Sequence, residues 1–292
     1  MTWDYSIVDV FTQTPLEGNA LAVFHDAAGI DAATMQKIAR ETNLSETTFI
    51  FAPERPASAA RVRIFTPSKE MVFAGHPTIG TAWVLRELGR VSREQSRFVL
   101  DENVGPVDIR VDGEGLVWLR TPPIRTLGEY DAEMSAAAIG LERADLLDGI
   151  PVQNRSAGNP MVFLAVRDVA AVDRAEVDSA ALRRLLAREP EPTGVFVFTP
   201  TPAGAYSRMF ASDLGIVEDP ATGSATGPLA AFMMDHSLVQ SAHGTRFYSE
   251  QGTKMGRRSI LHVHIDGERG ERAIEIGGHV TPVATATLRL PQ

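Results

Sequence analysis

Short apolar runs with the composition of strands alternate along this chain with stretches that have helical spacing. A helix is predicted to begin after Asp31, a favoured N-cap residue, because Met35, Ile38 and Ala39 then lie on one face. Runs rich in Phe, Ile, Val and Thr predict strands at 21–24, 47–51 and 61–65. This order of elements is typical of an α+β fold rather than of a series of βαβ units.

Two further helices are predicted after loops of small residues around a proline. The first is apolar at Trp83, Val84, Leu85 and Leu88 and ends at Gly89. The second is apolar at positions 229, 230, 232 and 233. Asp-Gly pairs at 112–113 and 266–267 predict tight turns in hairpins that follow each helix.

The chain repeats itself at about half its length. Residues 76–82 (HPTIGTA) match residues 219–225 (DPATGSA) at an offset of 219 − 76 = 143. Further matches follow in the same order: GN at 18–19 and 158–159, FIF at 49–51 and FVF at 196–198, RIF at 63–65 and RMF at 208–210, and VDGE at 111–114 and IDGE at 265–268. We therefore predict two pseudo-symmetric copies of one fold.

We place these copies at residues 1–123 and 124–292, with the option that the last strand returns to the first domain. The stretch 122–130, which contains two prolines and a glycine, is the expected connection between them.

The amino-acid composition excludes several kinds of site and several kinds of partner. The 292 residues include no cysteine, which excludes a disulfide framework, a thiolate zinc site and a cysteine nucleophile. The net charge is 28 − 37 = −9 and the basic residues are not clustered, so we expect no nucleic-acid partner. No apolar stretch approaches the ~18 residues that cross a bilayer, and we expect a cytoplasmic protein that binds no membrane.

The small-residue loops before the two apolar helices predict anion sites. The first N–H groups of a helix have no intrahelical partner and lie at the positive end of its dipole. Gly75 in the first loop and Thr222 and Gly223 in the second leave room for a carboxylate there. If a pseudo-twofold axis relates the halves, both helix ends face one interdomain cleft, where small-molecule sites tend to form.

Few titratable residues stand in these loops. His76 and Asp219 occupy matching places in the repeat, each directly before a proline. Asp219 can equally be a helix cap, whereas His76 is a weaker cap and favours a functional imidazole. Ser224 and Thr78 can either satisfy first-turn backbone groups or donate to a ligand. Glu46, at the start of a predicted strand, is by itself more typical of a solvated carboxylate than of a general base.

Other kinds of site find little support. The run 223–227 (GSATG) places its serine one position early for the G-x-S-x-G loop of a serine hydrolase. His262 and His264 share one face of a predicted strand, but no third ligand is evident, so we expect no metal. No glycine-rich dinucleotide or nucleotide loop is present, and no cofactor is expected.

At these positions the chain resembles the PhzF family of phenazine-biosynthesis isomerases. The matching segments arrive in order: DVF at 9–11 with GN at 18–19, NLSET at 43–47, RIFTP at 63–67, FAGHPT at 73–78, EDPATGSA at 218–225, and QG at 251–252 with MGR at 255–257. The resemblance implies the diaminopimelate-epimerase-like fold: a barrel-like sheet around a central helix in each half, an active site between the halves, and commonly a homodimer.

The resemblance also assigns roles. Glu46 matches the family's catalytic glutamate, which carries the proton, and His76 and Asp219 match its active-site partners. Ser224 matches a site hydroxyl and Gly75 the glycine whose backbone lies against the substrate. The remaining expected substrate-binding residues are Thr78, Thr222 and Gly223. Related amino-acid epimerases carry a cysteine in each loop, which this chain lacks, so the proton carrier has to be a carboxylate.

The implied activity is that of a cofactor-independent isomerase. It would move a proton between carbons of a small carboxylic acid of the dihydro-hydroxyanthranilate type, as in phenazine biosynthesis, with Glu46 as general acid and base. One alternative is a racemase or epimerase of a small amino or hydroxy acid that uses Asp219 or His76 as a second base. Another is a protein that binds a small acid without converting it.

Overall fold

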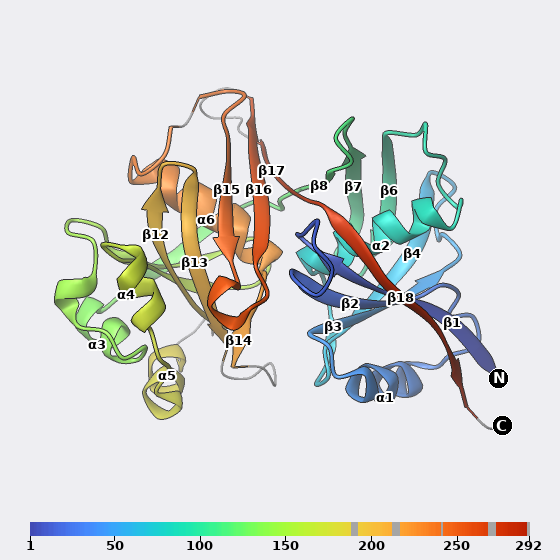
Figure 1. Cartoon of the computed structure of the whole chain (residues 1–292), viewed down its shortest axis with the longest axis horizontal. Coiled ribbons are helices and arrows are strands. Elements are labelled where there is room, and N and C mark those ends of the chain that lie inside the picture. The colour runs from blue at the N-terminus through green and yellow to red at the C-terminus, as the bar shows by residue number, and fades with distance from the viewer. Residues whose placement is uncertain (188–191, 212–216, 241, 268–272, 291–292) are drawn as a thin grey trace. The chain divides into compact units, whose positions relative to one another are not determined.

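The computed structural model describes residues 1–187, 192–211, 217–240, 242–267 and 273–290. The chain divides into two units, of which unit 1 comprises residues 1–120 together with the chain from 277 onward, and unit 2 comprises residues 121–276 (Figure 1). Strand β17 (Ala273–Gly278) carries the chain from unit 2 back to unit 1. Strand β18 (Val280–Arg289) then belongs to unit 1.

Unit 1 is built on a sheet in which β18, β1, β2, β3, β4, β6, β7 and β8 pair in that order, with the short β5 beside β4. The β2–β3 and β4–β6 pairs are parallel and the others are antiparallel. The strands are β1 (Thr2–Val10), β2 (Asn19–Phe24), β3 (Glu46–Phe51), β4 (Ser58–Phe65), β5 (Glu70–Met71), β6 (Arg97–Glu102), β7 (Gly105–Val111) and β8 (Val117–Arg120).

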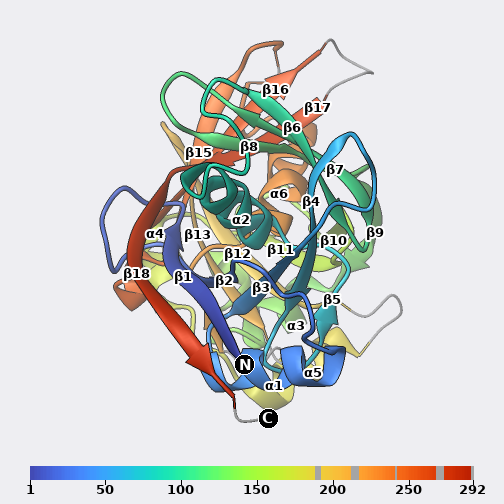
Figure 2. The ribbon, with the colours of Figure 1, turned by 90° about the vertical axis from the view of Figure 1, so that its right-hand side faces the viewer.

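Helix α2 (Gly75–Glu87) runs through the inside of unit 1. It is buried all round from Gly75 to Ala82 rather than along one stripe, as expected of a helix enclosed by strands. It contacts β1, β2, β3, β8 and β18, and Figure 2 shows strands of the unit on several sides of it. Gly80 permits this close packing, because a Cβ atom there would lie 2.6 Å from Cδ2 of Leu21. Helix α1 (Ala32–Thr42) covers the outer face, where its apolar side packs on Phe24, Phe49 and Phe65.

Unit 2 has the same pairing pattern. The order is β9, β10, β11, β12, β13, β15 and β16, with the short β14 beside β13, and the β11–β12 and β13–β15 pairs are parallel. The strands are β9 (Arg125–Tyr130), β10 (Val152–Ser156), β11 (Met161–Ala165), β12 (Gly194–Thr201), β13 (Gly204–Ala211), β14 (Glu218–Asp219), β15 (Arg246–Gln251) and β16 (Ser259–Asp266).

Helix α6 (Gly223–Asp235) is the buried helix of unit 2, where Phe232 packs against Phe163 and Phe198. Alternate residues of β11 and β12 face the other way and form a second apolar cluster with α3 (Ala132–Ala137), α4 (Val169–Arg174) and α5 (Ser179–Leu186). Figure 1 shows these three helices together on one side of the unit. Single 3₁₀ turns occur at Arg143–Asp145 and Thr253–Met255.

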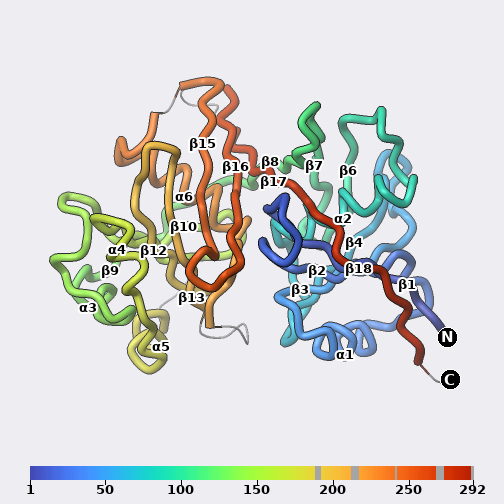
Figure 3. The backbone as a smooth tube through the Cα atoms, viewed as in Figure 1, coloured from blue at the N-terminus to red at the C-terminus, as the bar shows by residue number. Residues whose placement is uncertain are grey.

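The predicted mixed, sheet-dominated fold is confirmed, and the predicted strands and helices lie in β2, β3, β4, α1, α2 and α6. One expectation was wrong: residues 125–130, expected in a connection, form β9, which pairs with β10. The first and last described residues meet in unit 1, where Met1 N donates to Leu290 O at 2.9 Å (Figure 3).

Candidate active site

Glu46 and His76 lie side by side in unit 1. Nε2 of His76 is 3.3 Å from Oε2 of Glu46, and on the other side of the ring Nδ2 of Asn19 is 3.4 Å from Nδ1. The imidazole is buried, with 4% of His76 exposed, whereas the Glu46 side chain keeps 14% of its surface exposed. Within this group the Glu46 side chain is therefore the most exposed part, although its Oε2 atom is itself buried.

The ends of two parallel strands bring these residues together. Asn19 begins β2 and Glu46 begins β3, and the strands pair with Leu21 beside Glu46. Helix α1 ends at Thr42, and the left-handed conformation of its C-cap Asn43 (φ 51°) turns the chain towards β3. Helix α2 packs on both strands, so that His76, in its first turn, reaches both Asn19 and Glu46.

Burial keeps His76 neutral. Desolvation lowers the pKa of its imidazole from the usual 6.5 to about 3. The amide nitrogen of Asn19 can only donate, so Nδ1 of His76 accepts, and the proton of the neutral ring lies on Nε2. That nitrogen is the one beside Glu46. A neutral imidazole protonated at this position faces Glu46 with an N–H group and places no fixed positive charge in the site.

The start of α2 leaves backbone donors open. Its N-cap is Ala74, which has no side chain that can cap the first N–H groups. Gly75 is the first helical residue. Thr78 is fully buried, and its hydroxyl is 2.7 Å from Ala74 O and 2.6 Å from Oε1 of Glu102. The structure thus places the Thr78 hydroxyl against protein groups rather than towards a ligand.

In unit 2 a buried glutamine ties Asp219 to the start of α6. The hydroxyl of Thr222, the N-cap residue, donates to Oδ2 of Asp219 at 2.6 Å. Nε2 of Gln251 donates to Asp219 O at 2.7 Å and to Thr222 Oγ1 at 3.0 Å, and Oε1 accepts from Thr222 N at 3.1 Å. Since Gln251 is fully buried, this network fixes the Asp219 carboxylate to the first turn of the helix.

The matching of His76 with Asp219 in the sequence repeat is wrong as a structural equivalence. In unit 1, β5 pairs with the RIF segment through Met71 and Ile64. In unit 2, β14 pairs with the RMF segment through Asp219 and Met209. Asp219 therefore corresponds to Met71.

The two helices confirm this alignment. Each begins four residues after the end of the short strand, with Gly75 first in α2 and Gly223 first in α6. The second residue is His76 in α2 and Ser224 in α6, so these two are equivalent. Ser224 is partly exposed, whereas Gly223 is buried.

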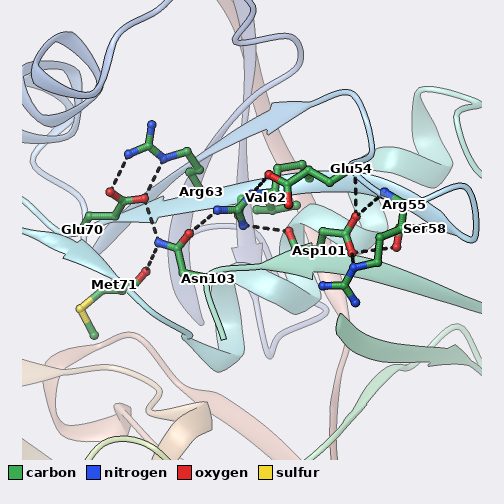
Figure 4. Close-up of polar contacts among 10 residues, drawn as sticks. Glu54, Arg55, Ser58, Val62, Arg63, Glu70, Met71, Asp101 and Asn103 are labelled. Atoms are coloured by element: carbon green, nitrogen blue, oxygen red, sulfur yellow. Dashed lines mark hydrogen bonds and ion pairs between the residues drawn. The ribbon is translucent and has the colours of Figure 1, made fainter. Parts of the chain in front are cut away.

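Equivalent ion pairs hold the strands that precede these helices. Arg63 of β4 makes two hydrogen bonds to Glu70 of β5, at 2.7 and 2.6 Å (Figure 4). Arg208 of β13 makes the same pair of bonds to Glu218 of β14, both at 2.8 Å. Such bidentate pairs add geometric definition to the chain that leads into each helix.

Sequence reasoning assigned no role to Asn19, Glu102 or Gln251. Asn19 and Gln251 both lie in segments that match the family, so the sequence did contain a signal for these two residues. Glu102 stands in a polar DEN stretch that resembles an exposed hairpin, and nothing in the sequence marks it as buried.

The other candidate features lie apart from these groups. Nδ1 of His264 is 3.1 Å from Oε2 of Glu275, and the His262 ring packs against Tyr248. No cluster of three or more His, Asp or Glu side chains in the described part of the chain is arranged to hold a metal ion. None of the helices in the described ranges has both the length and the apolarity of a membrane-spanning segment.

Known proteins resemble this chain over nearly its whole length. The family model "Phenazine biosynthesis-like protein" matches residues 8–286. An uncharacterized isomerase of Mesorhizobium japonicum is 38% identical, with 98% of this chain and 99% of the relative covered. The trans-2,3-dihydro-3-hydroxyanthranilate isomerase of Pseudomonas aeruginosa is 36% identical, with 94% and 95% covered.

Solved structures agree with this assignment. A Bacillus anthracis phenazine biosynthesis protein of the PhzF family superposes with a TM-score of 0.89 at 25% identity, covering 99% of this chain and 100% of that one. A hydroxyproline epimerase of Agrobacterium vitis shares the fold alone, with a TM-score of 0.68 at 14% identity over 98% and 92% of the chains. The names of the relatives support an isomerase. The chain belongs to the family of phenazine biosynthesis-like proteins, the PhzF family.

Proposed function

We propose that this protein is a cofactor-independent isomerase that moves a proton between carbons of a small carboxylic acid, with Glu46 as general acid and base. The observation that carries the proposal is the pairing of a partly exposed Glu46 with a buried, neutral His76, 3.3 Å away, at the start of α2. The imidazole presents an N–H group to the carboxylate, which in its ionised form can accept a proton from carbon and return it to another carbon.

The first turn of α2 would orient the substrate. With Ala74 as a cap that offers no side chain, the N–H of Gly75 lies at the positive end of the helix, where a carboxylate is stabilised. In unit 2 we assign substrate contacts to Asp219 and Ser224, supported by Thr222 and Gly223. The network around Gln251 holds Asp219 in one orientation, as such a contact requires.

We propose a substrate of the type named for the Pseudomonas aeruginosa relative, a dihydro-hydroxyanthranilate. Such an acid offers a carboxylate for the helix end and a carbon-bound proton for Glu46. Its hydroxyl and amino groups match polar partners of the kind that Asp219 and Ser224 provide.

Exchange with solvent deuterium tests the proposal. The purified protein is incubated in D₂O with trans-2,3-dihydro-3-hydroxyanthranilate and a panel of other carboxylic acids, and deuterium incorporation and product formation are followed by NMR and mass spectrometry. Glu46→Gln keeps the shape of the side chain but cannot carry the proton, and it should lower the rate by about 10²–10⁴-fold. Glu41→Gln, at an exposed position of α1, is the matched control and should react like the wild type.

The other outcomes separate the alternatives. A Glu46→Gln protein that exchanges at the wild-type rate contradicts the proposal. Exchange at an α-carbon with loss of optical purity indicates a two-base epimerase, for which Asp219 or His76 is the candidate second base. Binding without exchange across the panel indicates a protein that holds a small acid without converting it.

A further inference from the structure

Thr78 has one hydroxyl proton and two partners that both look like acceptors. Its Oγ1 lies 2.7 Å from Ala74 O and 2.6 Å from Oε1 of Glu102, and all three groups are buried. If Glu102 were a carboxylate, the hydroxyl proton would point to it and the bond to Ala74 O would be lost. Both contacts are hydrogen bonds only if Glu102 is a neutral acid that donates to Thr78, while Thr78 donates to Ala74 O.

The surroundings of Glu102 favour this neutral form. Only 4% of the residue is exposed, and Oε2 has no hydrogen-bond partner among the described residues. Burial raises the pKa of Glu102 to about 8, with the Thr78 hydroxyl and the charge of Arg61 on β4 opposing the shift. The Arg61 guanidinium itself binds the backbone oxygens of Val62 and Asp101. On α2 the titratable neighbour of Thr78 is His76, which is uncharged.

The residues on either side of Glu102 hold the end of β6 in place (Figure 4). Asp101 accepts from Ser58 Oγ at 2.8 Å, and Nδ2 of Asn103 donates to Glu70 Oε1 at 2.9 Å and to Met71 O at 3.2 Å. Because side chains alternate along a strand, these contacts anchor one face while Glu102 reaches the other. Glu102 therefore has little freedom to turn away from α2.

Unit 2 carries an amide at the equivalent position. β6 and β15 occupy the same place beside β4 and β13, and both end at a buried residue, Glu102 in one and Gln251 in the other. The amide of Gln251 donates to the N-cap Thr222 and is neutral at every pH. The fold thus places a buried polar side chain in hydrogen-bond contact with the first turn of the buried helix in both units.

We propose that Glu102 is a positioning residue which, as a neutral carboxylic acid, donates to Thr78 and so fixes the peptide that joins Ala74 to Gly75. The carbonyl held by Thr78 and the N–H of Gly75 belong to the same planar peptide, so fixing one orients the other. This inference rests on the proposed function, in which that N–H binds the substrate carboxylate. It predicts that ionisation of Glu102 loosens the site as the pH rises through about 8.

A titration without substrate tests the positioning directly. The full-length protein is labelled with ¹³C at glutamate carboxyls and ¹⁵N at glycine, and NMR spectra are recorded from acidic to alkaline pH. We expect one carboxyl with a midpoint near 8 and a Gly75 amide resonance that shifts with the same midpoint, both absent in Glu102→Gln. The exposed control Glu114→Gln should retain both. The inference is overturned if the Glu102 carboxyl titrates in the ordinary range of glutamate. It is also overturned if the Gly75 amide resonance does not shift when Glu102 titrates.

Kinetics then test the consequence for catalysis. Loss of one positioning hydrogen bond in Thr78→Val should lower kcat/KM about tenfold, mainly through KM, and Thr78→Ser should restore it. In the wild type kcat/KM should fall as the pH rises above about 8, and in Glu102→Gln that decline should be absent. An alkaline decline that persists unchanged in Glu102→Gln contradicts the role. A protein that converts no acid but shows the linked titration contradicts the proposed function and supports the positioning.

Discussion

The starts of α2 and α6 are built on one backbone plan and carry different chemistry. Each helix follows a two-residue strand held by a bidentate arginine–glutamate pair and begins with a glycine. In unit 1 the second helical residue is His76, and the nearby carboxylate, Glu46, comes from β3. In unit 2 the second residue is Ser224, and the carboxylate, Asp219, comes from β14.

This difference indicates that the carboxylates of Asp219 and Glu46 are suited to different chemical roles. Asp219 is 9% exposed and is held by a hydrogen bond from Thr222, which in turn is held by Gln251. Glu46 is in contact with a neutral imidazole and retains more exposed surface. A carboxylate fixed by a hydroxyl is suited to hold a ligand, whereas one that is open and beside an uncharged ring is suited to gain and lose a proton.

The largest expected effect tests this division of roles. Glu46→Gln should reduce solvent exchange by about 10²–10⁴-fold, because it removes the proton carrier. Asp219→Asn removes one charge-assisted contact and should reduce exchange by about 10- to 100-fold. Both are measured as kcat/KM by deuterium incorporation under the same conditions. Equal losses in the two variants would contradict the division and favour a two-base mechanism.

The next effect concerns pH and stability. The folded protein holds His76 neutral down to about pH 3, whereas the unfolded chain takes up a proton near 6.5. Between these values the unfolded state binds more protons, so the free energy of unfolding falls as the pH is lowered, by at most about 1.4 kcal/mol per pH unit. His76→Gln should remove this dependence, as measured by urea unfolding across the acid range.

Ser224→Ala, at the equivalent position of α6, is the matched control for that experiment. It alters the second residue of a buried helix without changing a titratable group. Its stability should differ from the wild type by the same amount at every pH. If His76→Gln also parallels the wild type, the imidazole is not held neutral by burial.

The sequence predicted much of the fold because its signals are local. Asp31 caps α1 through its bond to Thr34 N, and the apolar residues at helical spacing lie against the core. The predicted equivalence of His76 and Asp219 was wrong because it, too, rested on a local sequence pattern. A proline, a glycine and a hydroxyl residue recur in both loops at similar spacing, but strand pairing sets the true register, five residues away from the sequence match.

The site was only partly predictable, because contacts that depend on strand pairing and helix packing are not recorded in local sequence patterns. The family motifs contain Glu46 and His76, but their contact depends on the parallel pairing of β2 with β3 and on the packing of α2 against both. Glu102 has an exposed neighbour, Asn103, and only the alternation of the strand turns its own side chain inward. Burial of a lone acid is a property of the packed sheet that no local pattern records.

A smaller effect is expected at Gln251, whose neutral amide is the counterpart of Glu102. Gln251→Glu would remove both donated bonds and place a second carboxyl beside Asp219. We expect a loss of about 2 kcal/mol or more in the free energy of unfolding at neutral pH, and a smaller loss in acid. Urea unfolding measures it, with the exposed Gln95→Glu as control. A variant as stable as the wild type would show that the amide is not needed there.

The last comparison distinguishes the contribution of a buried hydroxyl from that of the acid that contacts it. Thr226 of α6 donates to Thr222 O at 3.0 Å, in the same way that Thr78 of α2 donates to Ala74 O at 2.7 Å. Thr226→Val removes one buried hydrogen bond and should cost about 1 kcal/mol in the free energy of unfolding. Thr78→Val also leaves Glu102 without an acceptor for its proton, and should cost about 1–3 kcal/mol more. Urea unfolding of both variants in mild acid measures the two losses in the free energy of unfolding. If the two helix starts are otherwise alike, the difference between these losses is due to Glu102. Equal costs would mean that the acid makes no bond to Thr78, and the likeness between Glu102 and Gln251 would then be one of position only.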